Sequence, residues 1–235
     1  MIIAGLQKTT LIDYPNKIAC VVFLAGCNFR CPWCYSSELV LPLKIVEQPR
    51  ISEKEFLDFL RGRQGLLEGV VICGGEPTIN KELPQFIEKI KNLGYPVKLD
   101  TNGSNPERLK DLVKANLIDY VAMDIKASIN NKIYENILGE GIEISDIKES
   151  VNFLKNSNID FEFRTTVVNS IHRKEEFLDI AKWIGGENVK YYLQNFRAEK
   201  TIDPEFEKVK PFKKEFLEQI AKDISPYFKL CQVRA

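Results

Sequence analysis

Residues 18–34 read IACVVFLAGCNFRCPWC, an apolar run that passes directly into three cysteines. The run Ile18–Leu24 is short and continuous, which is typical of a buried strand. The thiols of Cys27, Cys31 and Cys34 follow it with the spacing C-x-x-x-C-x-x-C. Because thiolates select zinc, copper(I) or iron–sulfur clusters, the end of this strand is a candidate metal site.

The number and spacing of the cysteines distinguish between these metals. A structural zinc site normally has four protein ligands, commonly as two separated cysteine pairs, whereas this segment has three cysteines and no partner pair. A [4Fe–4S] cluster normally takes four cysteines, so three would leave one iron to bind another ligand. Two alternatives stay open at this point: a zinc hook completed by a distant residue, and buried structural thiols.

The composition is that of a soluble globular chain. It has 235 residues, 44% apolar and 28% charged, which is long enough to bury a large core. The 33 basic and 33 acidic residues cancel, so the charge favours neither a nucleic acid nor a membrane as partner. No signal peptide is evident, and no apolar run approaches the roughly 20 residues that span a bilayer. Six cysteines with three clustered indicate a metal site in the cytoplasm rather than a disulfide framework.

Hydrophobic periodicity predicts strands that alternate with helices. The predicted strands are Ile2–Gly5, Ile18–Leu24, Glu68–Cys73, Tyr95–Leu99, Tyr120–Ile125, Phe161–Val168, Val189–Leu193 and a last edge strand, Tyr227–Val233. Helices are expected after the capping box Ser52-x-x-Glu55, over Leu83–Leu93, from Pro106, and at about 145–156, 174–184 and 211–223. This alternation indicates right-handed βαβ units and a parallel sheet. The sequence therefore predicts an α/β fold, a partial (β/α)6 TIM-like barrel, in one domain over 1–235 with a core of about 16–196 and a C-terminal helical extension of about 198–235.

Polar residues follow the predicted strands at their carboxyl ends, where parallel α/β folds bind ligands. They are Gly74-Gly75-Glu76, Asp100-Thr101-Asn102-Gly103, Asp124, Lys126, Gln194 and Asn195, and Arg164 lies within the predicted strand Phe161–Val168. Each has a structural alternative: a simple turn for the Gly-Gly-Glu run, a surface salt bridge for Asp124 with Lys126, and an ion pair for Arg164. Their convergence on one rim with the cysteine loop favours a binding site.

The cysteine segment resembles the cluster motif of the radical S-adenosylmethionine (SAM) superfamily, with the aromatic Trp33 just before the last cysteine. The residues Gly26–Cys34, preceded by Thr10-Leu11-Ile12-Asp13-Tyr14-Pro15, are similar to the glycyl-radical-enzyme activating enzymes. Among these the resemblance is strongest to the anaerobic ribonucleoside-triphosphate reductase activating proteins. It implies the radical SAM fold and one [4Fe–4S] cluster on Cys27, Cys31 and Cys34, with SAM bound at the open iron.

The resemblance also implies which residues bind the cofactors: Trp33, Gly74, Gly75, Glu76, Asp100, Asn102, Asp124, Lys126, Arg164 and Asn195. The segment Gly74-Gly75-Glu76 would hold the ammonium of the methionine moiety through backbone carbonyls, which glycines let approach closely. Asp124 would hydrogen-bond the ribose hydroxyls. Lys126 would pair with the methionine carboxylate, a role that suits a flexible ammonium.

Three further expectations follow from the same resemblance. Asp100 and Thr101 resemble part of a monovalent-cation site in related activating enzymes. Arg164 matches an arginine near the cofactor. Relatives carry a histidine where this chain has Asn195, so ribose recognition there is expected to pass to Gln194 or Asn195.

The resemblance implies reductive cleavage of SAM to a 5′-deoxyadenosyl radical, which makes a glycyl radical on a partner enzyme. The expected partner is anaerobic ribonucleotide reductase, and flavodoxin or ferredoxin would supply the electron. No side chain is expected to be catalytic, because the radical chemistry belongs to the cofactors. The alternatives are a radical SAM enzyme that acts on a small molecule or peptide, and a non-catalytic metal-binding or scaffold protein on the same barrel.

The remaining residues with reactive side chains are expected to be structural. His172 is the only histidine and lies in a polar connection, which favours a solvated loop residue. Cys20 and Cys73 alternate into apolar strands and are expected to be inert core residues. Cys231 has no partner in reach by sequence.

Overall fold

The computed structural model describes residues 1–129 and 132–234, and Ala235, the last residue of the predicted extension, lies outside this range. The chain forms two compact units. The first comprises Met1–Asn28, Glu38–Thr101 and Asn105–Val121, and the second comprises Phe29–Ser37, Asn102–Ser104 and Ala122–Ala235.

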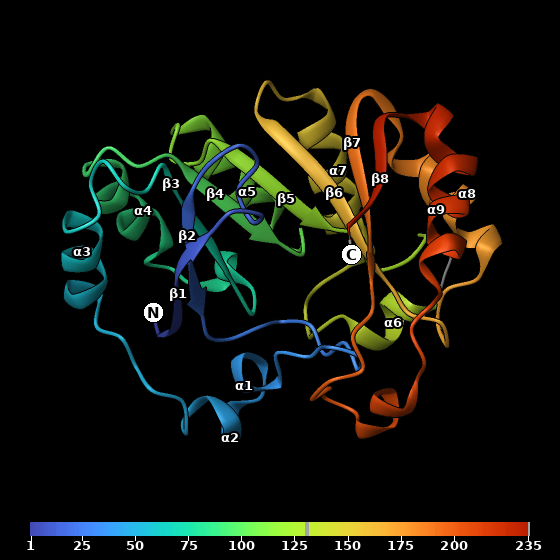
Figure 1. Cartoon of the computed structure of the whole chain (residues 1–235), viewed down its shortest axis with the longest axis horizontal. Helices are drawn as coiled ribbons and strands as arrows, with labels where there is room; N and C mark the ends of the chain where they lie inside the picture. Colours follow the sequence, from blue (N-terminus) through green and yellow to red (C-terminus); the bar gives the residue numbers. More distant parts are fainter. Residues whose placement is uncertain (130–131, 235) are drawn as a thin grey trace. The chain divides into compact units, whose positions relative to one another are not determined.

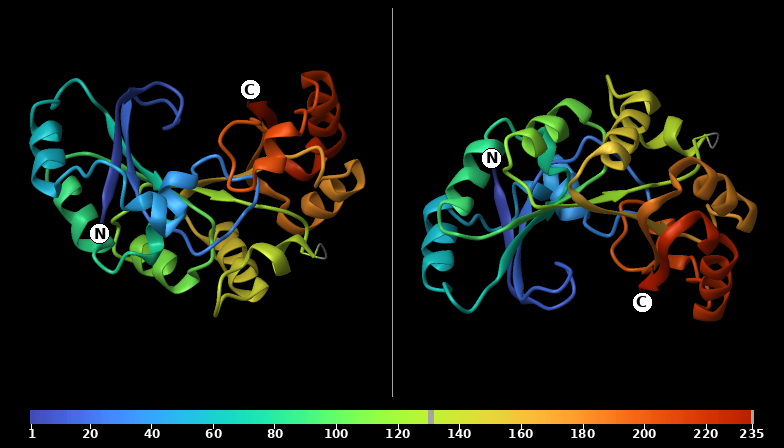
Figure 2. Two further views of the ribbon diagram at one scale, coloured as in Figure 1. Left: turned by 90° about the horizontal axis from the view of Figure 1, so that it is seen from below. Right: turned by 90° about the horizontal axis from the view of Figure 1, so that it is seen from above.

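The first unit contains four strands: β1 (Ile3–Thr10), β2 (Ala19–Leu24), β3 (Gly69–Gly74) and β4 (Val97–Thr101). β1 forms an antiparallel hairpin with β2 (Figure 2). β2 pairs in parallel with β3, and β3 pairs in parallel with β4. β2 and β3 are buried at most positions, which is the burial that continuous apolar runs indicate for central parallel strands.

The first unit contains three longer helices and three short helical elements. They are α3 (Glu53–Arg61), α4 (Leu83–Lys91) and α5 (Pro106–Lys114), with the short elements α1 (Ser37–Val40), α2 (Pro42–Ile45) and η1 (Pro77–Ile79). The Ser52 hydroxyl accepts a hydrogen bond from the Glu55 backbone at 3.1 Å and caps α3, as the capping box predicts. α3 and α4 lie side by side (Figure 1), with the rings of Phe56 and Phe86 5.5 Å apart.

The second unit contains β6 (Asp160–Val167), β7 (Gly186–Asn195) and β8 (Phe228–Arg234), while β5 (Tyr120–Asp124) has residues in both units. β7 pairs in parallel with both β6 and β8. The other elements are α6 (Ile133–Ile137), α7 (Ile144–Asn156), α8 (Lys174–Ile184), η2 (Pro204–Lys208), α9 (Lys214–Ile224) and η3 (Ser225–Tyr227). α8 and α9 lie side by side (Figure 1) and are joined by an ion pair between Lys174 and Asp223 at 2.7 Å.

The C-terminal strand β8 is held by a buried charge. Glu162 on β6 is fully buried, and Arg234 donates to both of its carboxylate oxygens at 2.5 and 2.8 Å. A bidentate pair of this kind fixes geometry as well as charge. It anchors the last edge strand, which the sequence predicted over nearly the same residues.

The eight strands follow one another in chain order, from β1 to β8, in one sheet. β1 and β8 stand at the two ends of that order, so the sheet is open and lacks the closure of an eight-stranded barrel. The predicted α/β class and the partial (β/α)6 barrel with a parallel sheet are confirmed. Within the described residues, no helix has the length and apolar character needed to cross a membrane.

One strand boundary differs from the prediction in a way that affects the candidate site. β4 begins at Val97 rather than Tyr95 and ends at Thr101 rather than Leu99. Proline has no N–H to donate to a strand ladder, so Pro96 takes part only through its carbonyl, which accepts from Val70 at 3.0 Å. As a result Asp100 and Thr101 lie inside the strand, where their neighbours are fixed by its pleat.

Candidate cofactor site

The cysteine segment is divided between the two units, with Cys27 in the first and Cys31 and Cys34 in the second. Residues 31–34 form a turn in which the Cys34 N–H donates to the Cys31 carbonyl at 3.0 Å. The segment before η2 holds this turn, because Ile202 donates to the Cys34 carbonyl at 3.0 Å and Asp203 donates to the Pro32 carbonyl at 2.9 Å.

Trp33 stabilises the same turn from within. Its side chain is buried, and its ring lies 6.2 Å from the ring of Phe206. Trp33 therefore packs against its own unit and keeps the two neighbouring cysteines in place. Cofactor binding by Trp33 itself stays a prediction.

The donor set fits an iron–sulfur cluster in its chemistry. None of the six cysteines, all of them in the described part of the chain, forms a disulfide, and Cys27 and Cys34 are partly exposed. In the part of the chain that the structure describes, no group of three or more histidine, cysteine or acidic side chains is arranged as a metal site. The case for an iron–sulfur cluster therefore rests on the soft thiol donors that clusters require and on a lysine that interacts electrostatically with two of them.

That lysine is Lys126, which lies just beyond β5. Burial opposes its charge, but the Asp124 carboxylate and the thiols of Cys31 and Cys34 outweigh burial and raise the pKa of Lys126. A cation beside two candidate cluster ligands is suited to hold an anionic group of a bound cofactor.

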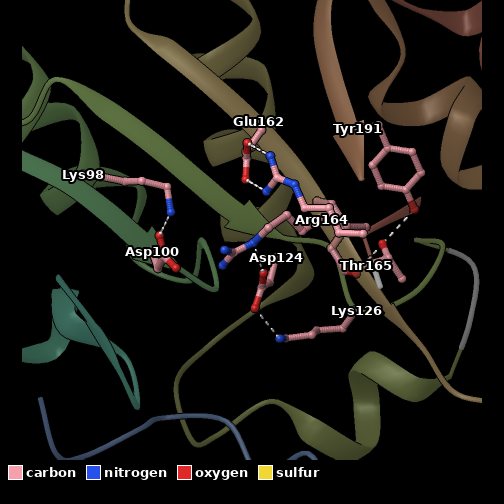
Figure 3. A network of polar contacts seen from close by, with 10 residues as sticks. Lys98, Asp100, Asp124, Lys126, Glu162, Arg164, Thr165 and Tyr191 are labelled. Atoms are coloured by element: carbon pink, nitrogen blue, oxygen red, sulfur yellow. Dashed lines mark hydrogen bonds and ion pairs between the residues drawn. The ribbon is translucent and has the colours of Figure 1, made fainter. Parts of the chain in front are cut away.

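Asp124 lies between two cations (Figure 3). Its carboxylate accepts from the Lys126 ammonium at 2.9 Å and from Nε of Arg164 at 3.0 Å. Burial alone would raise the pKa of Asp124, but the charges of Lys126 and Arg164 lower it to about 2. The salt bridge of Asp124 with Lys126 and the ion pair of Arg164, which were the structural alternatives for these residues, are therefore both present. Together they also fix the direction of the Lys126 side chain.

The end of β3 packs directly against the cysteine loop within the first unit. A Cβ atom on Gly75 would lie 1.9 Å from the Gly26 carbonyl oxygen, and one on Gly74 would lie 2.1 Å from the Leu24 carbonyl oxygen. Gly74 also has a φ of +132°, which only glycine adopts readily. The two glycines are therefore required by the close approach of two backbone segments.

Glu76 is buried and is held by three donors. Its Oε1 atom accepts from the Thr78 N–H at 3.0 Å, from the Thr78 hydroxyl at 2.6 Å and from the Thr101 hydroxyl at 2.7 Å. These bonds join the ends of β3 and β4. The Glu76 carboxylate therefore has a structural role. Binding of SAM by the backbone of Gly74-Gly75-Glu76 stays a prediction.

Asp100 has a partner that the sequence analysis missed. Lys98, two residues earlier on β4, forms an ion pair with Asp100, and the Lys98 side chain is only 1% exposed. Because side chains two apart on a strand share a face, the pattern Lys-x-Asp in an apolar strand was the available signal. Lys98 supplies Asp100 with a cation from the chain itself, and the expected monovalent-cation site at Asp100 and Thr101 stays a prediction.

Asn102 and Gly103 form a turn inside the second unit. Asn102 Oδ1 accepts from the Ser104 N–H at 2.9 Å, and the Gly103 carbonyl accepts from the Ser150 hydroxyl at 2.7 Å. Gly103 has a φ of +75°, and a Cβ atom there would lie 2.0 Å from the Met123 methyl carbon. Cofactor binding by Asn102 stays a prediction.

Asn195, at the end of β7, has an acceptor atom that no group of the described chain satisfies. Its Nδ2 donates to the Phe212 carbonyl at 2.7 Å, which fixes the orientation of the amide. Oδ1 is then buried without a hydrogen-bond partner. Because an unmet buried acceptor costs roughly 1–3 kcal/mol, this atom is suited to accept a hydrogen bond from a ligand.

The prediction for His172 was wrong. The side chain is only 2% exposed and hydrogen-bonds to the backbone of Val168 and of Lys126. The local sequence is polar, but the fold turns this connection back against the end of β5.

An open, largely parallel sheet with a cysteine loop after β2 defines a partial α/β barrel with candidate thiolate ligands at a strand end. Residues 21–184 match the family model of the Radical SAM superfamily, and the chain belongs to this superfamily. It is therefore a radical SAM enzyme, and the cofactors of its family are a [4Fe–4S] cluster and SAM.

Two relatives are similar to this chain over most of its length, and a third over about half of it. It is 34% identical over 231 residues to a Methanocaldococcus jannaschii protein named "Putative glycyl-radical enzyme activating enzyme MJ1227", covering 96% of this chain and 92% of the relative. A second M. jannaschii protein, named "Putative glycyl-radical enzyme activating enzyme MJ1632", is 25% identical over 230 residues, with coverages of 94% and 86%. The 7-carboxy-7-deazaguanine synthase of Thermococcus kodakarensis is 31% identical over 122 residues, covering 45% of this chain and 47% of the relative.

Solved structures share the fold at low identity. The crystal structure of Streptococcus suis SuiB bound to precursor peptide SuiA has a TM-score of 0.67 and 12% identity, covering 92% of this chain. This chain spans 48% of the SuiB chain, about half its length. QueE from Escherichia coli has a TM-score of 0.57 and 16% identity, with coverages of 98% and 92%. These likenesses show the fold alone.

Proposed function

We propose that this protein is an activating enzyme that cleaves SAM reductively and generates a glycyl radical on a partner enzyme. The similarity over 96% of the chain to a relative named as such an enzyme is the observation that carries the proposal. The ion pair of Lys126 with Asp124 at 2.9 Å and the electrostatic effect of Cys31 and Cys34 on Lys126 support the SAM-binding part of it.

Different side chains bind different parts of SAM. Cys27, Cys31 and Cys34 hold the cluster, and Lys126 pairs with the methionine carboxylate. Asp124 stays ionised because its pKa is about 2, so it accepts hydrogen bonds from the ribose hydroxyls. The unmet Oδ1 of Asn195 accepts a further hydrogen bond from the nucleoside.

The reaction needs one electron and one hydrogen atom. When bound, the cluster supplies an electron that divides SAM into methionine and a 5′-deoxyadenosyl radical, which takes a hydrogen atom from a glycine of the partner. The chain contributes binding, orientation and exclusion of water, with no proton transfer by a side chain. Anaerobic ribonucleotide reductase is the proposed partner, flavodoxin or ferredoxin the electron donor, and the cytoplasm the location.

Anaerobic reconstitution tests this proposal. The protein is loaded with iron and sulfide, reduced with flavodoxin, and mixed with SAM and anaerobic ribonucleotide reductase. We expect release of 5′-deoxyadenosine and a glycyl doublet by electron paramagnetic resonance. Cys27→Ala, Cys31→Ala and Cys34→Ala should each abolish both signals, whereas Cys231→Ala on β8 is the matched control and should retain both.

A second candidate function is the conversion of a small molecule. The local similarity to the Thermococcus kodakarensis synthase favours it. In that case 5′-deoxyadenosine would form only with a small substrate, and no glycyl doublet would appear on any reductase. Absence of 5′-deoxyadenosine release with an intact reduced cluster, with the reductase and with a small-molecule substrate alike, would instead indicate a non-catalytic protein.

A further inference from the structure

Both backbone polar atoms of Lys126 are held by buried side chains. The Lys126 N–H donates to the Tyr134 hydroxyl at 3.0 Å, and the Lys126 carbonyl lies 2.8 Å from Nε2 of His172. Tyr134 and His172 are each 2% exposed. Tyr134 lies on α6, and His172 lies in the connection before α8.

The tautomer of His172 follows from its second contact. The Val168 N–H donates to Nδ1 of His172 at 3.0 Å, so Nδ1 has no proton and is an acceptor. In a neutral imidazole the proton is then on Nε2. Nε2 therefore donates to the Lys126 carbonyl, and the ring joins Val168, just after β6, to Lys126, two residues after β5.

Lys126 lies where the hydrogen bonds between β5 and β6 end, and Tyr134 and His172 supply its backbone bonds instead. The preceding residue, Ile125, is held by β6, because its N–H donates to the Arg164 carbonyl at 2.7 Å and its carbonyl accepts from the Thr165 hydroxyl at 2.8 Å. Lys126 lies beyond the end of β5 at Asp124. Without Tyr134 and His172, both of its backbone groups would lose the bonds that fix its backbone.

The fixed backbone matters because the Lys126 side chain is long. A lysine ammonium is on a flexible four-carbon stem, so its position depends on where the stem begins and on the group that holds its tip. The Asp124 carboxylate holds the tip at 2.9 Å (Figure 3), and the two backbone bonds hold the base.

We propose that Tyr134 and His172 are positioning residues that fix the backbone of Lys126 and thereby aim its ammonium at the carboxylate of SAM. This inference rests on the proposed function for the ligand, but the fixing of Lys126 is a property of the chain alone. Neither residue touches SAM in this account.

Two substitutions of His172 separate its two contacts. A Gln side chain ends at the ε position, so His172→Gln places an amide N–H where Nε2 donates to Lys126. An Asn side chain ends at the δ position, so His172→Asn keeps an acceptor for Val168 and loses the Lys126 bond. Tyr134→Phe removes the hydroxyl on the other side and keeps the ring.

Two measurements on the full-length reconstituted protein test the inference. We expect His172→Asn and Tyr134→Phe to raise the Kd for SAM about 3- to 10-fold, as for the loss of one hydrogen bond, whereas His172→Gln should stay near the wild-type value. Nitrogen-15 resonances of the lysine ammonium groups report on Lys126 without SAM. The Lys126 resonance, assigned with Lys126→Arg, should move toward those of exposed lysines in the Asn and Phe variants only.

The outcomes distinguish the inference from the proposed function. If the Kd and the Lys126 resonance change equally in His172→Asn and His172→Gln, in proportion to the unfolding midpoint, His172 is only structural and the inference is overturned. If the wild-type protein does not bind SAM, the proposed function fails. The Lys126 resonance still tests the fixing of Lys126 in that case.

Discussion

Lys98 and Asp100 face each other on β4 with almost no access to solvent, at 1% and 10% side-chain exposure. Removing one member of a buried ion pair is costly because the other charge stays buried without compensation. Substitution of either Lys98 or Asp100 is therefore expected to lower the stability of the protein.

Replacing Lys98 with methionine should strongly destabilise the protein. Lys98→Met keeps a long side chain but leaves the Asp100 carboxylate without its cation, and we expect the free energy of unfolding in urea to fall by about 3–5 kcal/mol. The matched control is Lys89→Met, whose pair with Glu53 has side chains 51% and 38% exposed, so its loss should stay below about 1 kcal/mol. Equal losses in the two variants would contradict a buried, compensated pair.

His172 should make stability depend on pH. Burial lowers the pKa of His172 below 6.5, against the opposing effects of its bond to the Lys126 carbonyl and of the Glu176 charge. Below about pH 6.5 the unfolded chain therefore takes up a proton that the folded chain does not. Stability should be full above pH 6.5 and fall as the pH is lowered from there toward the folded pKa. Because His172 is the only histidine, His172→Gln should remove this slope in urea unfolding measured between pH 7.5 and 5.5.

At the scale of elements, the end of β3 and the cysteine loop after β2 form one packed unit. The parallel register of β2 and β3 brings Leu24 opposite Gly74, and the next residue, Gly75, donates its N–H to the Leu24 carbonyl at 2.9 Å. The loop that presents Cys27 is thus shaped by the neighbouring strand.

A methyl group at Gly75 should disturb that loop. Gly75→Ala places a carbon 1.9 Å from the Gly26 carbonyl oxygen, so the two backbone segments must separate. We expect a loss of about 1–3 kcal/mol in the free energy of unfolding and less iron bound per chain after reconstitution. Gly62→Ala, at the end of α3 with a φ of −71° and its nearest atom at 3.6 Å, should be neutral or stabilising by up to about 1 kcal/mol. Normal iron content in Gly75→Ala would show that the close approach is dispensable.

At the scale of the whole molecule, a cofactor that binds only the folded chain stabilises it by mass action, by about 2.7 kcal/mol at a hundredfold excess over its Kd. For a chain of this length, that corresponds to about 5–10 °C in Tm. Removal of the cluster by an iron chelator should lower the Tm of the wild-type protein by this amount. Cys27→Ala, Cys31→Ala and Cys34→Ala should already unfold at the lower temperature and respond little to the chelator. An identical response in wild type and variants would show that the iron is held elsewhere.

The sequence by itself determined the order and type of the elements and the position of the cysteine loop. Strand and helix periods, the Ser52 cap and Pro106 are local features, and each specifies structure within a few residues of itself. The three cysteines lie close together in sequence, so their spacing alone indicated the family. Element boundaries were less well determined. β1 extends to Thr10 and β7 begins at Gly186, and β4 starts at Val97 because Pro96 has no N–H to donate.

Only the tertiary structure decided which groups meet. His172 contacts Lys126 from 46 residues away, and Arg164 contacts Asp124 from 40 residues away, so no local pattern contains either pair. The polar surroundings of His172 in the sequence indicated solvent, yet the fold buries the ring. The physical reason is that local hydrophobic periodicity predicts the face of an element on which a side chain lies. The residue that this side chain contacts depends on the long-range pairing of strands.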